Sequence, residues 1–169
     1  MPQGSPFWTF SLALYRTPGV PGACIALQDE CGVDVNVLLF ALCLASQGRA
    51  LPASGLAQAD GAVSLWRSEA VRPLRAVRRF LREALLGADA SAIAALRDKV
   101  KAAELESERL QQEALFALKP AANWGVAGDP IAAAARNMDA CADMLGASFP
   151  SGPRQAMLDA FGDLLSRAT

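Results

Sequence analysis

The densest concentration of chemical groups in this sequence is a run of arginines. Six arginines and one glutamate lie between Arg67 and Arg82. Spacings of three, four and three residues place four of these arginines on one helix face, namely Arg72, Arg75, Arg79 and Arg82. Guanidinium groups in such an array suit phosphates or carboxylates. The pattern therefore predicts a face that binds an anion or an acidic protein partner.

The same arginines could instead be neutralised within the chain. The following helix offers the acidic side chains Glu104, Glu106, Glu108 and Glu113, and a two-helix hairpin would bring both sets of charges together. Nucleic acid is not expected as the partner, because the chain has a net charge of -1 and lacks aromatic residues between the arginines, apart from Phe80. Membrane-surface binding has only this one basic stripe in its favour.

A second polar cluster flanks the most apolar segment and consists of Gln28, Asp29, Asp34 and Asn36. Paired aspartates can bind a divalent cation or act as acid and base. Asp34, however, also suits a helix N-cap, and Asn36 suits the first turn that follows it. Capping and local hydrogen bonding are the simpler interpretation of this cluster.

Several classes of chemistry lack the residues they require. The chain has no histidine, which removes the usual general base and the commonest zinc ligand. It has no glycine-rich phosphate loop and no CxxC or HExxH motif, so we expect no metal and no cofactor. Its four cysteines are expected to be reduced thiols in a cytoplasmic protein, and they are Cys24, Cys31, Cys43 and Cys141.

The composition predicts an all-α protein. The 169 residues include 35 Ala and 23 Leu but only 9 Val, 3 Ile and 3 Thr, which favours helices over strands. We expect one compact domain over residues 1–169, a bundle of about six to eight helices without a β-sheet. The longest strongly apolar run, residues 35–45, is too short to be a transmembrane segment.

Glycine, proline and capping residues divide the chain into expected helices. The expected ranges are 6–16, 20–30, 35–47, 62–86, 92–118, 130–147 and a last helix that follows the cap Ser151 and ends near 167. Residues 49–61 are expected to be a connection that holds at most a turn of helix. Ser91 should cap the longest helix, and Pro73 should kink the 62–86 helix or begin a new one. The 35–47 helix is apolar on all sides and should be the buried centre.

Two helices have apolar faces that suggest partners. The first helix carries a second stripe, Trp8, Leu12 and Tyr15, which should be buried or kept for a partner. The 93–117 helix carries apolar residues in steps of three and four, a heptad-like seam. This seam could pack within the chain or against a second copy, forming a homodimer.

The segment 7–48, FWTFSLALYRTPGVPGACIALQDECGVDVNVLLFALCLASQG, is followed by Trp66 and VRPLRAVRRFLR. Together they resemble a family of proteobacterial proteins of about this length whose function is unknown. The resemblance covers residues 6–86, with Cys43 where the family has tryptophan. It implies a bacterial cytoplasmic protein, and it transfers no catalytic residue.

Two functional hypotheses follow. The first is a non-enzymatic helical protein that acts through a protein or an anionic partner. The alternative is an enzyme, or a binder of a small anionic metabolite, that uses the arginine-rich helix together with Asp29 and Asp34.

Overall fold

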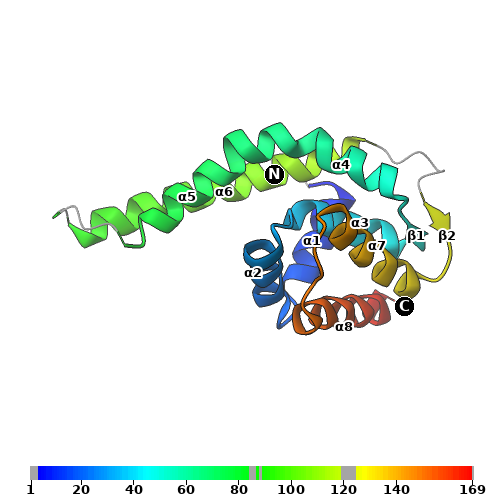
Figure 1. Cartoon of the computed structure of the whole chain (residues 1–169). Helices are drawn as coiled ribbons and strands as arrows, with labels where there is room; N and C mark the ends of the chain where they lie inside the picture. Colours follow the sequence, from blue (N-terminus) through cyan, green and yellow to red (C-terminus); the bar gives the residue numbers. More distant parts are fainter. Residues whose placement is uncertain (1–3, 84–86, 88, 119–124, 169) are drawn as a thin grey trace.

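The computed structural model describes residues 4–83, 87, 89–118 and 125–168, and most of these are helical (Figure 1). In chain order the elements are α1 Pro6–Tyr15, α2 Val20–Cys31, α3 Val35–Ser46, β1 Arg49–Ala50, α4 Ala53–Trp66, η1 Arg67–Val71, α5 Arg72–Phe80, α6 Ala90–Ala117, β2 Val126–Ala127, α7 Pro130–Met144 and α8 Ser151–Ala168. The all-α prediction is confirmed. None of the helices in these described ranges combines the length and the apolar character that crossing a membrane requires.

Helix α3 is the centre of the fold, as its all-round apolar sequence predicted. Every residue from Asn36 to Ala45 is buried, and α3 packs against α1, α4, α6 and α7. The Phe7 ring of α1 meets the Phe40 ring edge to face, with centroids 5.4 Å apart. Because α3 is buried on all sides, no side of this helix faces water and none carries a polar stripe.

The segment 49–61 holds more regular structure than the connection with a turn of helix that the sequence predicts, because α4 begins at Ala53 and not at 62. It contains β1, which pairs with β2 in an antiparallel bridge of two residues each, and the first turns of α4. Leu56, Ala59 and Val63 are buried at spacings of three and four, which is the helical period. This minimal strand pair is the one departure, among the described residues, from the expected absence of β-structure.

Helices α4, η1 and α5 follow one another without interruption, and α6 returns alongside them. In Figure 1 the α5–α6 hairpin extends away from the other helices. Pro73 does not end the helix; a π-helical turn lies just before it, and the Arg72 N–H donates to the Arg67 carbonyl. Asp89, not Ser91, caps α6 by accepting from the Ala92 N–H at 3.2 Å.

The hairpin has two further differences from the sequence prediction. Helix α5 ends at Phe80, short of the expected end at 86, and residues 84–86 lie outside the described part of the chain. The heptad-like seam of α6 is only partly covered. Val100 is partly buried and Ser107 is buried, on the side of α6 that packs against α4, η1 and α5. The other side of the seam is exposed; we call Leu96, Ala103, Leu110 and Ala117 the outer stripe.

Candidate functional site

A groove of about 550 Å³ lies where the α5–α6 hairpin meets the other helices. It is bounded by α1, α2, the start of α3, α5 and α6. The predicted second stripe of α1, formed by Trp8, Leu12 and Tyr15, lines one wall. Apolar side chains from α2, α3 and α6 continue this lining, namely Ile25, Val35, Leu39 and Leu105. Charged side chains of α5 and α6 form the rest. The groove therefore combines an apolar wall with a charged one, a composition typical of small-molecule sites.

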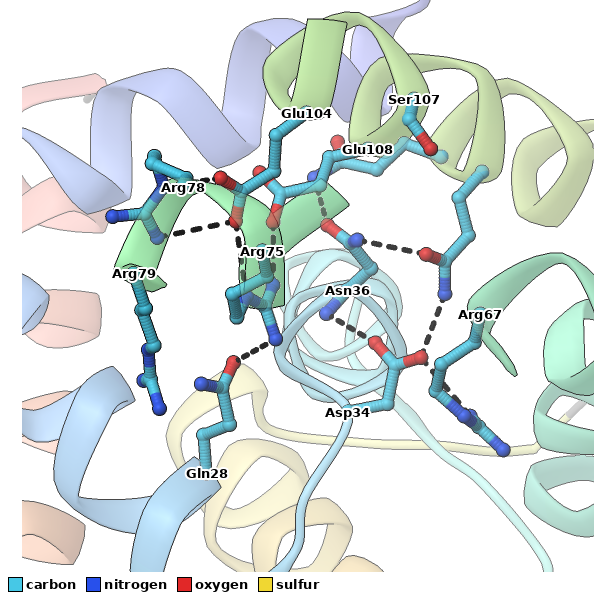
Figure 2. Close-up of polar contacts among 12 residues, drawn as sticks. Gln28, Asp34, Asn36, Arg67, Arg75, Arg78, Arg79, Glu104, Ser107 and Glu108 are labelled. Atoms are coloured by element: carbon cyan, nitrogen blue, oxygen red, sulfur yellow. Dashed lines mark hydrogen bonds and ion pairs between the residues drawn. The ribbon is translucent and has the colours of Figure 1, made fainter. Parts of the chain in front are cut away.

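Arg75 is fully engaged at the middle of the charged wall. Its Nε lies 3.0 Å from Glu104, its Nη1 lies 2.6 Å from the Gln28 side-chain oxygen, and its Nη2 lies 2.7 Å from Glu108 (Figure 2). These contacts join α2, α5 and α6, because one guanidinium on α5 donates to side chains of both α2 and α6. Arg75 thus serves as an internal link, which is the neutralising role that the sequence left open.

The two glutamates that share Arg75 differ in the direction of their pKa shifts. Glu104 is buried, and burial alone would raise its pKa, but hydrogen bonds from Arg78 and Arg75 outweigh this and lower the pKa below its ordinary value. Burial raises the pKa of Glu108, and Arg75 only partly opposes the effect. Glu104 is therefore held as a carboxylate, whereas Glu108 is the carboxyl that protonates first as the pH falls.

The other three arginines of the predicted face, Arg72, Arg79 and Arg82, differ in whether they have an ion-pair partner. Arg79 lies 3.1 Å from Asp29 in an exposed ion pair at the edge of the groove, and hydrogen bonds from Arg79 and Gln28 lower the pKa of Asp29. Arg82 also lines the groove, but Arg72 does not. Neither Arg82 nor Arg72 forms an ion pair with any residue in the described part of the chain.

Asp34 and Asn36 belong to a buried polar network beside the groove (Figure 2). Asp34 caps α3 by accepting from the Asn36 N–H at 2.8 Å, and its other oxygen accepts from Arg67 and Gln111. Asn36 donates to Gln111 at 3.1 Å and accepts from Gln112 at 2.8 Å. These contacts agree with the capping interpretation of the sequence.

The structure does not bring Asp29 and Asp34 into one site. Asp29 lines the groove and pairs with Arg79, whereas Asp34 is used by Arg67 and the network. Within the described ranges, no group of three or more Cys, Asp or Glu side chains is placed to hold a metal ion. The four cysteines are free thiols, as predicted.

Two buried oxygens in the groove wall lack hydrogen-bond partners among the described residues. They are the hydroxyl of Ser11 and the side-chain carbonyl of Gln112, and each residue is only 3% exposed. A buried polar atom without a partner costs about 1–3 kcal/mol. A ligand group that supplied a partner, once neighbouring side chains shifted, would recover that free energy.

Sequence reasoning missed several residues of this region. Lys101 has no sequence signal that sets it apart from other charged residues of its helix, yet it lines the groove and forms no ion pair with a described residue. Arg78 stands outside the three-four-three spacing but binds Glu104. Gln111 and Gln112 look like surface residues, and only their position opposite Asn36 explains their burial. Two adjacent glutamines in an otherwise charged helix were the one available signal.

The comparisons with known proteins agree with the resemblance seen in the sequence and extend it. A family model described as a protein of unknown function, DUF2390, matches residues 6–115, well over half of the chain and past the end of α5. No curated protein and no solved structure matches. The match includes α1, α2, α3, α5 and most of α6, so every wall of the groove lies within it. The chain belongs to the DUF2390 family of proteins of unknown function.

Proposed function

We propose that this protein is a non-enzymatic binding protein that takes a small amphipathic anion in the groove. The observation that carries the proposal is a pair of unmatched cations, Arg82 and Lys101. The other three cationic side chains of the groove have carboxylate partners, whereas these two have none among the described residues. An anionic group on the ligand would supply the missing charge.

The two unmatched cations lie at one end of the groove, so its two ends differ in charge. The hairpin pairs Arg75 with Glu108 and Arg78 with Glu104, so Arg82 and Lys101 lie further toward the hairpin tip. Gln112 marks the opposite end, about 16 Å from Lys101 at 1.5 Å per helical residue. An elongated ligand would place its anionic end at the tip side and its apolar body along α1.

The alternative of an enzyme has less support. Burial raises the pKa of the Cys24 thiol in the groove to about 12, so it stays protonated and is a poor nucleophile. The carboxylate of Glu104 is engaged by two arginines, which leaves it a weak base. A binding role requires neither group to react. The cytoplasmic location also stays a proposal, supported by the four free thiols.

Calorimetric titration with octanoate and with octanol tests the anion requirement. We expect octanoate to bind at least about tenfold more tightly than octanol, because only the acid can pair with Arg82 and Lys101. The double variant Arg82→Ala/Lys101→Ala should lose this preference. Arg72→Ala is the control, since it removes an exposed cation of the same arginine-rich segment that does not line the groove.

Two results would contradict this function. One is equal binding of the acid and the alcohol by the unaltered protein. The other is a double variant that retains the preference of the Arg72→Ala control.

A further inference from the structure

The outer stripe of α6 is an apolar surface on the side of the helix away from the groove. Leu96 is 50% exposed and Leu110 is 43% exposed, and exposed alanines, Ala103 and Ala117, continue the same line. Trp66 extends this surface: its indole N–H donates to the Ser107 carbonyl at 3.0 Å, and it is 43% exposed. Leucine and alanine alternating at a spacing of seven residues form an apolar seam that suits a second helix.

The central part of the stripe, from Leu96 to Leu110, is symmetric about Ala103. Leu96 precedes Ala103 by seven residues and Leu110 follows it by seven. An antiparallel copy of the same helix, centred at Ala103, would therefore set each Leu96 against Leu110 of the second copy. The two small alanines would meet at the centre and allow the helix axes to approach closely. An isologous contact of this kind is closed and gives a dimer.

The charges of α6 favour the antiparallel direction. Residues 90–103 hold three cations and one aspartate, whereas residues 104–117 hold four glutamates and one arginine. Antiparallel pairing thus places a basic half against an acidic half, twice per dimer. Beside the stripe, Lys99 would meet Glu106 of the second copy. Lys99 has no ion-pair partner among the described residues, and the Glu106 side chain is 56% exposed although it binds Arg109.

We infer that two copies of this chain associate through α6, antiparallel and centred at Ala103. The occupant of the stripe is thus a second copy, as the heptad-like spacing allowed. The inference does not depend on the proposed function, because the stripe and the groove lie on different faces of α6. Each copy keeps its own groove in the dimer.

A charge swap tests both the association and its register by sedimentation equilibrium. Lys99→Glu and Glu106→Lys should each weaken the dimer about tenfold, since each loses two ion pairs per dimer. The combined variant should return to within about threefold of the unaltered protein. Lys99 and Glu106 are two helical turns apart, about 10 Å, so they do not pair within one chain. Recovery in the combined variant would therefore come from a contact between copies.

A cysteine placed at the centre gives a second readout. Ala103→Cys, in a Cys31→Ser background that removes the one cysteine that is not buried, should form a covalent dimer on oxidation, because the two copies meet there. Leu105→Cys, exposed on the groove side, is the matched control and should stay monomeric under the same conditions. A protein that sediments as a monomer at all concentrations overturns the inference. A dimer that the charge swap does not restore, or that cross-links equally at Leu105→Cys, overturns the proposed register.

Discussion

Replacing Arg75 is the most informative perturbation of the link between the hairpin and the body. Arg75→Ala removes three charge-assisted hydrogen bonds, to Gln28, Glu104 and Glu108. The Arg75 side chain is only 20% exposed, so these contacts are less screened than surface pairs, which contribute about 0–1 kcal/mol. Glu104 keeps Arg78 as a partner, but Glu108 is left without one.

The expected loss lies between two limits. Removing one partner of a fully buried pair costs about 3–5 kcal/mol. Because Arg75 retains some exposure and Glu108 can protonate, we expect Arg75→Ala to lower the free energy of unfolding by about 2–3 kcal/mol. Adding Glu108→Gln should recover about 1 kcal/mol, since it removes the stranded carboxylate while keeping a hydrogen-bonding group there.

Urea unfolding at neutral pH measures these differences, with Arg72→Ala as the control. Both substitutions replace arginine by alanine on the same helix, so helix propensity changes equally. Arg72 is exposed and has no ion pair with a described residue, so its loss should stay within about 0.5 kcal/mol. If Arg75→Ala is no more destabilising than Arg72→Ala, Arg75 does not link the helices and the reasoning fails.

Three further predictions concern the core, metals and pH. Leu42 is fully buried in α3, so Leu42→Asp should prevent soluble folding; a soluble variant with a cooperative thermal transition would refute this. Treatment with a chelator should leave the melting temperature unchanged, because no group of acidic or thiol side chains in the described ranges is placed to hold a metal ion; a drop of several degrees would contradict this. The lowered pKa of Glu104 adds stability above its ordinary value of 4.5 that is lost as the pH falls below it, so Glu104→Gln should destabilise the protein at pH 7 and flatten the acid side of the stability curve. The raised pKa of Glu108 adds stability at low pH that is lost as the pH rises through that pKa, so Glu108→Gln should stabilise the protein at pH 7. Urea unfolding across a range of pH measures both effects. If Glu104→Gln and Glu108→Gln change the free energy of unfolding at pH 7 in the same direction, the assignment is wrong.

The amino-acid sequence determined the helical fold and many of the helix ends, because both depend on interactions between residues close together in the chain. Abundant alanine and leucine favour helices wherever they lie. Asp34 caps α3 through the amides of its own next residues, and Gly32 ends α2 with a φ of 71° that glycine adopts at little cost. The burial of α3 also followed from sequence, since a helix apolar on all sides has no face to offer water.

The tertiary structure alone decided which charges meet. Arginine spacing placed Arg75 on a face with Arg72 and Arg82, but only the register of the hairpin set Arg75 between Glu104 and Glu108 and left Arg82 unmatched. The same register turned half of the α6 seam inward and half outward. Such pairings join residues far apart in the chain, and helical periodicity fixes the faces of one helix without fixing how a second helix slides along it. The groove exists because of that register, and no local pattern encodes it.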